Sequence, residues 1–287
     1  MPHIHLLPDL MLEPLVRSAL LEDLGRAGDL TTDAIVPPGL IAEARLVARQ
    51  SGVVAGLALA RLTFQLLAPE THFAITSPDG SDVGPESVIA TIKGPAAALL
   101  TGERTALNFL CRLSGVASAT RLVARAVAHT PARITCTRKT TPGLRAVEKY
   151  AVRVGGGSNH RFGLDDAMLI KDNHVALAGG VTQALTLARS RAGHLVKIEL
   201  EVDTLAQLDE ALAAGVDVVL LDNMSVSQLA EAVRRVDGRA ITEASGRITL
   251  EAARQIAEAG VDLIAIGWLT HSAPILDIGL DSAASAV

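Results

Sequence analysis

Four short apolar runs in the second half of the chain end at a nearly constant spacing. They read "VKIELE", "VVLLD", "ITEAS" and "LIAIG". Their last residues, Glu201, Asp222, Ser245 and Gly267, stand 21, 23 and 22 residues apart. The segments between the runs repeat apolar residues at helical spacing and end near a glycine, as a left-handed helix cap requires. This alternation of strand and helix predicts a parallel sheet covered on both faces.

A repeat of about 22 residues is close to the shortest possible strand–helix unit. It favours a closed or nearly closed α/β barrel over an open two-sided sheet. Ser225 and Thr249 stand where two of the helices should begin and are predicted N-caps. Upstream, the segments 133–138 and 167–173 read as two more strands and 159–164 as a weaker one. We therefore expect six or seven strands.

The first part of the chain lacks this rhythm and mixes strands with helices. Helices are predicted over 9–25 and 57–68, and strands over 41–56, 72–83 and 87–95, with a "PDG" turn between the last two. A long helical stretch starts at Ala96. These patterns predict an α+β sandwich domain.

The fold class expected for the whole chain is therefore α/β, with an incomplete (β/α) barrel following an N-terminal α+β sandwich. The predicted domains are 1–115 for the sandwich and 116–275 for the barrel. The last residues, 276–287, could return to the first domain.

Composition excludes several classes of protein. The net charge is −5 and aromatic residues make up only 2% of the chain, which argues against nucleic-acid binding. No run of eighteen apolar residues and no secretory signal is evident, so we expect a cytoplasmic protein without membrane contact. Cys111 and Cys136 show no CxxC spacing and are expected to be reduced.

The segment 135–174 is a basic island within this acidic chain. It holds seven lysines and arginines against four carboxylates, a local balance of +3, which suggests a local role. Part of the island could be structural. Arg145, Lys149 and Arg153 are spaced four residues apart on a predicted helix, where they would form a solvated or subunit-facing stripe.

Polar residues stand at the predicted C-terminal ends of the strands, where α/β barrels gather their catalytic groups. Any one of them could be an ordinary solvated loop residue. Together they place cations after the early strands, carboxylates after the middle ones and small residues after the late ones. Small residues let backbone N–H groups approach a phosphate, carboxylates suit Mg²⁺ or sugar hydroxyls, and cations suit a polyanion. The pattern predicts a barrel enzyme acting on a phosphorylated, carboxylated small molecule.

Other nucleotide and catalytic motifs are absent. The segment "VGGGSNHRFG" is neither GxGxxG nor GxSxG, because His160 replaces a required glycine in both, and no P-loop occurs. His160 and His174 lack a compact zinc spacing.

Several motifs resemble the quinolinate phosphoribosyltransferase family, the decarboxylating enzymes of NAD biosynthesis. They are "GERTALNFL", "LSGVAS", "TRKTTPGLR", "KYAVRVGGGSNHRFGLDDAMLIKDNH", "ELEVD", "VLLDN", "EASGRI" and "LTHS…LDIGLD". The resemblance implies the same two-domain fold. It also implies conversion of quinolinate and phosphoribosyl pyrophosphate (PRPP) to nicotinate mononucleotide, pyrophosphate and CO₂, with Mg²⁺ as cofactor.

The resemblance also implies residue roles. The quinolinate pocket would comprise Arg138, Lys139, His160 and Arg161, joined by Arg104 from a neighbouring subunit. Lys139 and Lys171 would serve the pyrophosphate, and Glu201 and Asp222 would hold Mg²⁺ and the ribose hydroxyls. Lys139, Lys171, Glu201 and Asp222 would thus be the catalytic group, and Ser245, Gly246 and Gly267 the 5′-phosphate site. Because Arg104 would act in trans, the smallest complete enzyme would be a homodimer, which could assemble into a hexamer.

Three alternatives remain open at this stage. A paralogue associated with molybdenum uptake shares parts of these motifs. An enzyme that uses nicotinic acid without decarboxylation would have one carboxylate to grip and would need fewer paired cations. An inactive scaffold or anion-binding module would keep the fold alone.

Overall fold

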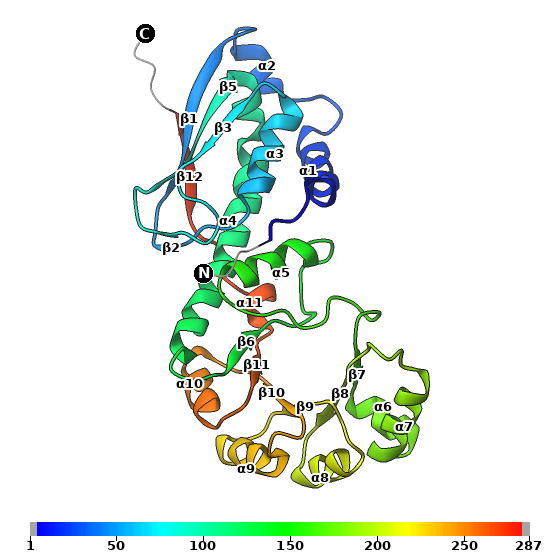
Figure 1. The fold of residues 1–287 in the computed structure, drawn as a ribbon. Coiled ribbons are helices and arrows are strands. Elements are labelled where there is room, and N and C mark those ends of the chain that lie inside the picture. Colours follow the sequence, from blue (N-terminus) through cyan, green and yellow to red (C-terminus); the bar gives the residue numbers. More distant parts are fainter. Residues whose placement is uncertain (1–4, 283–287) are drawn as a thin grey trace. The chain divides into compact units, whose positions relative to one another are not determined.

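A computed structural model describes residues 5–282 of the chain (Figure 1). Within this range the chain divides into two compact units. The first contains residues 5–121, 141–155 and 272–282, and the second contains 122–140 and 156–271. The division falls inside one long helix, α4 (Ala96–Val127). The domain limits inferred from sequence, with a boundary after residue 115, stay a prediction. Of the predicted return segment, residues 283–287 lie outside the described residues.

The first unit is built on an antiparallel sheet of four strands in the order β12-β1-β5-β3. These strands are β1 (Ile41–Ala48), β3 (His72–Ile75), β5 (Val88–Pro95) and β12 (Ile278–Ser282). A two-stranded pair, β2 (Gly52–Val53) and β4 (Asp82–Val83), lies beside it. The C-terminal strand β12 pairs with β1, so the two ends of the chain's sequence contribute to one sheet.

The helices of this unit are α1 (Asp9–Leu24), α2 (Leu30–Ile35), α3 (Leu57–Leu67), α5 (Arg145–Val154) and the first part of α4. Helices α3 and α4 contribute to the core cluster of the sheet. Phe64 of α3 and Leu110 of α4 are fully buried in one cluster with Leu46 of β1 and Ile92 of β5. The helices predicted over 9–25 and 57–68 are thus confirmed, and so are the strands around the "PDG" turn.

Asp79 of that turn caps helix α3 from outside. Its carboxylate accepts the backbone N–H groups of Gly56 and Leu57 at 3.0 and 3.2 Å, and the hydroxyl of Tyr150 on α5 donates to it at 2.7 Å. A carboxylate at a helix N-terminus satisfies donors that the helix itself leaves unpaired. Burial raises the pKa of Asp79, and these three hydrogen bonds act in the opposite direction.

Replacing Tyr150 by Phe should therefore lower the free energy of unfolding by about 1–3 kcal/mol, because a buried acceptor loses one donor. Urea denaturation followed by circular dichroism measures this. In an Asp79→Asn background the same replacement should cost less, since the carboxylate is gone. An unchanged unfolding midpoint for Tyr150→Phe would show that the hydroxyl contributes nothing.

One expectation for the basic island is wrong. Lys149 is not part of a solvated stripe, because it and its neighbour Glu148 are fully buried. The Glu148 carboxylate accepts hydrogen bonds from the Arg112 guanidinium at 2.9 Å and from the backbone and hydroxyl of Thr141 at 3.0 and 2.8 Å. These charges therefore stabilise the first unit. Helix α5 itself forms as predicted.

The second unit contains a six-stranded parallel sheet in the order β6-β11-β10-β9-β8-β7. Its strands are β6 (Arg133–Thr135), β7 (Met168–Ile170), β8 (Ile198–Val202), β9 (Val218–Asp222), β10 (Ile241–Ser245) and β11 (Leu263–Ala265). Strands β6 and β7 form the two edges and do not pair with each other, so this is an incomplete barrel. Each strand lies within a segment predicted from sequence.

The weak seventh strand expected over 159–164 does not form. In its place a single parallel bridge joins Ser158 to Thr135 of β6, and a tight turn follows. Asp166 accepts the backbone N–H groups of Phe162 and Gly163 at 2.6 and 3.0 Å and thereby closes this turn.

Helices follow the strands along the outside of the sheet (Figure 1). They are α6 (Asp172–Ala178), α7 (Val181–Arg191), α8 (Leu205–Ala213), α9 (Val226–Val236), α10 (Leu250–Glu258) and α11 (Trp268–His271). Ser225 and Thr249 accept hydrogen bonds from the first turns of α9 and α10, which confirms both predicted caps. No helix among residues 5–282 is long and apolar enough to cross a membrane.

Candidate active site

Two adjoining hollows lie at the C-terminal ends of the parallel strands. We call them the arginine pocket, of about 430 Å³, and the glycine pocket, of about 640 Å³. Thr137, Lys139, Asp222, Ser245 and Ala265 line both of them. The two hollows therefore form one continuous site in the second unit.

Ten of the eleven residues predicted from sequence line this site. The arginine pocket holds Arg138, Lys139, His160, Arg161, Lys171, Glu201, Asp222 and Ser245, and the glycine pocket adds Gly246 and Gly267. The eleventh, Arg104, is an exposed residue of α4 in the first unit. The ten predicted residues that share a site therefore all belong to the unit that contains the parallel sheet.

The two arginines of the arginine pocket carry unsatisfied donors. Within the described part of the chain, the buried Nε atoms of Arg138 and Arg161 have no hydrogen-bond partner. Arg161 donates from Nη1 to the carbonyl of Ala167 at 3.0 Å. Burial, together with the nearby charge of Arg138, lowers the pKa of Arg161. Two partly buried guanidinium groups with N–H groups to spare form a site for an anion with paired oxygens.

A pair of carboxylates stands beside these cations. Glu201 lies near the C-terminal end of β8, and Asp222 is the last residue of β9. Lys171 Nζ lies 3.5 Å from Glu201 Oε2. Burial raises the pKa of Glu201; Lys171 opposes this shift, and the negative charge of Asp222 adds to it. Asn223 donates to Asp222 Oδ2 at 2.5 Å. Glu201 and Asp222 thus offer two negatively charged acceptors within reach of a common ligand.

The glycine pocket is formed by close backbone approaches. Gly246 has φ +106°, and a Cβ at this position would come within 2.2 Å of Asn223 Oδ1. A Cβ on Gly267 would lie 3.1 Å from Lys139 Cδ. The pocket also contains the start of α10, whose unpaired N–H groups suit an anion.

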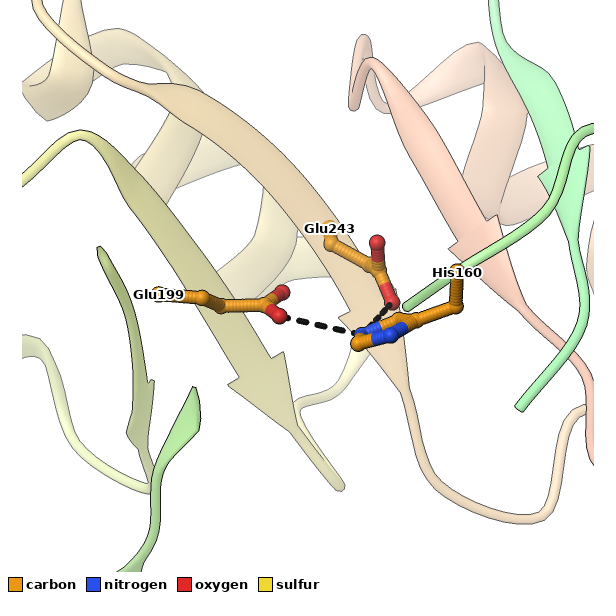
Figure 2. A group of neighbouring side chains, drawn as sticks. All are labelled: His160, Glu199 and Glu243. Atoms are coloured by element: carbon orange, nitrogen blue, oxygen red, sulfur yellow. Dashed lines mark ion pairs between the residues drawn. The ribbon is translucent and has the colours of Figure 1, made fainter. Parts of the chain in front are cut away.

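Sequence reasoning gave no role to two acidic residues of this site. Glu199 on β8 and Glu243 on β10 are only 8% and 3% exposed. Figure 2 shows both carboxylates directed at the imidazole of His160, with His160 Nε2 at 3.0 Å from Glu199 Oε2 and 3.6 Å from Glu243 Oε1. The signal was available: alternate residues of a strand face the same side, so Glu199 shares a face with Glu201.

Neither cysteine belongs to this site. Cys111 and Cys136 are buried and are not joined in a disulfide, in line with the expectation of reduced thiols. Burial raises the pKa of Cys111, which disfavours a reactive thiolate.

Comparison with known proteins gives a consistent picture. The model of the quinolinate phosphoribosyl transferase C-terminal domain matches residues 116–281, and that of the N-terminal domain matches 29–114. The chain belongs to the quinolinate phosphoribosyltransferase family. The resemblance inferred from its motifs is confirmed.

Relatives within the family match along almost the whole chain. A probable nicotinate-nucleotide pyrophosphorylase (carboxylating) from Bacillus subtilis is 46% identical, covering 95% of this chain and 93% of the relative. The enzyme of that name from Mycobacterium leprae is 47% identical, with 93% and 95% covered. The solved nicotinate-nucleotide pyrophosphorylase of Francisella tularensis is 35% identical, has a TM-score of 0.93 and covers 98% and 99% of the two chains. The two-domain fold expected for a quinolinate phosphoribosyltransferase is thus confirmed.

Adding a methyl group at Gly246 tests the close approach in the glycine pocket. Gly246→Ala should destabilise the protein by about 1–3 kcal/mol more than Gly238→Ala, because only the first also overpacks its surroundings. Gly238 is the matched control: its φ is +72°, yet nothing lies within 4 Å of the added Cβ. Urea unfolding of both variants measures the difference. Equal losses would mean that the contact with Asn223 is not restrictive.

Proposed function

We propose that this protein transfers the phosphoribosyl group of PRPP to quinolinate and releases pyrophosphate, CO₂ and nicotinate mononucleotide, as a pentosyltransferase of de novo NAD biosynthesis. The observation that carries the proposal is the pair of guanidinium groups with unsatisfied buried Nε atoms, set at the barrel end beside a carboxylate pair. Membership of the family supports this reaction, and the paired cations of the arginine pocket support quinolinate as the substrate.

Quinolinate fits the arginine pocket by charge and shape. It carries two adjacent carboxylates on a flat ring, and Arg138 and Arg161 offer planar donors that match carboxylate geometry. His160 and Lys139 line the same wall. A dianion also offsets the repulsion between two like-charged guanidinium groups, so binding should order both of them.

PRPP would occupy the rest of the site. Its 5′-phosphate would lie in the glycine pocket, where Ser245, Gly246 and Gly267 let backbone N–H groups approach it. Lys139 and Lys171 would bind the pyrophosphate. Lys139 lines both pockets, which places it where the two substrates would meet.

Glu201 and Asp222 fit a role in holding Mg²⁺ and the ribose hydroxyls. Mg²⁺ in proteins is typically held by one or two carboxylates, with the remaining positions filled by substrate phosphates and water. Asp222, which lines both pockets, and Glu201 of the arginine pocket fit that requirement. When bound, Mg²⁺ would neutralise part of the charge on the departing pyrophosphate.

The side chains around the site suggest how the reaction would proceed. Lys139 and Lys171 stabilise the charge that builds up as the C1′–oxygen bond of PRPP breaks. Glu201 and Asp222 favour the cationic ribose. The arginines hold quinolinate so that its ring nitrogen donates its electron pair to C1′. The C2–carboxylate bond then breaks, its electron pair stays on C2 beside the positive ring nitrogen, and a proton replaces the lost CO₂.

We further propose that the enzyme works in the cytoplasm as a homodimer, able to assemble into a hexamer, with Arg104 reaching the partner's quinolinate. It should bind neither nucleic acid nor membranes. Arg104 is exposed on α4, so its side chain is accessible to a second copy. A third cation would add to the grip on a substrate with two carboxylates.

A nicotinate-specific enzyme without decarboxylation is the nearest alternative in chemistry. It would have a single carboxylate to bind, whereas this pocket offers two guanidinium groups with spare donors. Incubation with PRPP, Mg²⁺ and either quinolinate or nicotinate separates the two. Quinolinate-dependent release of CO₂ supports the proposal, and turnover of nicotinate alone would reject it.

Arg138→Ala should reduce kcat/KM for quinolinate by an amount equivalent to about 2–5 kcal/mol of transition-state binding, as for other truncated buried charge pairs. Arg133→Ala is the matched control, since this exposed arginine begins β6, the strand that leads to Arg138, and lines neither pocket. Its kcat/KM should stay at the wild-type value. Circular dichroism verifies that both variants fold. Near-normal turnover by Arg138→Ala would remove this residue from the site.

Hybrid dimers test whether Arg104 acts in trans. Arg104→Ala and Arg138→Ala should each be nearly inactive alone. Co-expressed, they should regain about a quarter of wild-type activity, because half of randomly formed dimers are hybrids and each hybrid has one intact site out of two. If Arg104 acts within its own chain, no activity returns.

A further inference from the structure

Two members of the His160–Glu199–Glu243 cluster, His160 and Glu243, line the arginine pocket, and Glu199 contacts His160 from outside the lining. Glu199 precedes Glu201 by two residues and Glu243 precedes Ser245 by two, so each pair projects to the same side of its strand. Barrel interiors at this depth are normally filled by apolar branched side chains. Two nearly inaccessible carboxylates there are costly unless they are paired, which suggests that they perform a task for the site above.

The hydrogen bonds of His160 define which ring nitrogen carries the proton. The backbone N–H of Arg161 donates to His160 Nδ1 at 2.7 Å, so the lone pair of the ring lies on Nδ1. A neutral imidazole has only one such lone pair. Nε2 therefore carries hydrogen, and at 3.0 Å it donates to Glu199 Oε2. His160 thereby links a buried carboxylate to the backbone of Arg161.

This tautomer also separates two readings of the cluster. The ligating atoms of His160, Glu199 and Glu243 lie within 4.8 Å of one another, as in a metal site. A metal on Nε2 would need the lone pair at that nitrogen, and the ring would then have to carry hydrogen on Nδ1. The Arg161 N–H already points at Nδ1, so the two hydrogens would collide. The geometry favours a positioning device over a metal centre.

The positive charges of the neighbouring arginines suggest what the cluster does. Arg138 and Arg161 repel each other, and the negative charge of Glu199 acts on Arg161 in the opposite direction to that repulsion. Glu243 adds a second negative charge at the same ring nitrogen, with its Oε1 3.6 Å from His160 Nε2 (Figure 2). The charge of Glu199 thus opposes the repulsion on Arg161 while no substrate is bound, and Glu243 brings a second carboxylate to the same wall of the pocket.

We propose that Glu199 and Glu243 are positioning residues for quinolinate binding. Glu199 fixes His160 as the Nε2–H tautomer, His160 in turn fixes the Arg161 backbone, and both carboxylates hold the arginine wall in place before the dianion arrives. The proposal rests on the function proposed above. Glu199 lines neither pocket, and PRPP is bound by other groups.

Steady-state kinetics distinguishes positioning from a merely structural role. Glu199→Ala should raise the KM for quinolinate at least about tenfold and leave the KM for PRPP within about twofold, since it removes only the anchor of Arg161. Glu199→Gln keeps an acceptor for Nε2–H and should bring the quinolinate KM back to within about threefold of wild type. Equal changes in both KM values, or no rescue by Gln, would overturn the proposal.

A surface pair supplies the matched control. His129 Nε2 and Glu258 Oε1 also lie 3.0 Å apart, but both side chains are largely exposed. Glu258→Ala removes a histidine–glutamate contact of the same length far from either pocket's lining residues. It should change neither KM.

Nitrogen-15 NMR of histidine-labelled protein tests the tautomer without any turnover. His160→Gln identifies the signal among the eight histidines. The wild-type signal should be that of the neutral Nε2–H form, kept in Glu199→Gln and lost to tautomer averaging in Glu199→Ala. An Nδ1–H form in the wild type, or a stoichiometric transition metal that Glu199→Ala loses, would overturn the proposal. If quinolinate is not turned over at all, the proposed function fails, and the NMR result still decides the tautomer.

Discussion

The repulsion between cations gathered at one end of a parallel sheet is the constraint on which this site depends. Arg138, Arg161, Lys139 and Lys171 lie around a single pocket, and like charges at such separations disfavour one another, most strongly where water is excluded. Carboxylates offset them from two directions. Glu201 and Asp222 stand beside the cations at the strand ends, and Glu199 and Glu243 meet at the imidazole of His160. A dianionic substrate would then complete the balance from above.

The parallel sheet makes this arrangement possible because it brings the ends of distant segments to one edge. Each strand delivers alternate residues to the same face, so a strand such as β8 supplies one carboxylate at the surface of the pocket and another below it. The incomplete barrel leaves β6 and β7 as unpaired edges. The turn after Ser158, next to β6, is what carries His160 and Arg161 into the site.

Much of this was accessible from the sequence, for identifiable physical reasons. The constant spacing of Glu201, Asp222, Ser245 and Gly267 predicted the parallel strands, since a repeated strand–helix unit has few alternative folds. The polar strand ends predicted many residues of the two pockets, and the family resemblance supplied His160 and Arg161. Roles for buried charges could not be read in this way. Lys149 looks like a surface residue by its helical spacing, and only the three-dimensional structure shows that it is fully buried.

Glu199 was missed for a related reason. In "IELE" the second glutamate, Glu201, ends the predicted strand and was therefore assigned a role. Glu199 lies inside the strand and looked like an ordinary strand residue. Glu199 contacts His160, which is distant in sequence and lies in a turn that had been predicted as a strand. Contacts between a strand interior and an irregular loop have no periodic signature, so they emerge only in three dimensions.

The central claim is that the arginine wall is the receptor for a dianion with adjacent carboxylates. A crystal structure of the protein with pyridine-2,3-dicarboxylate tests it most directly. The account predicts both carboxylates against the guanidinium groups of Arg138 and Arg161, with the ring nitrogen directed toward the region between Glu201 and Asp222. A ligand bound elsewhere, or bound with its carboxylates turned away from both arginines, would contradict it.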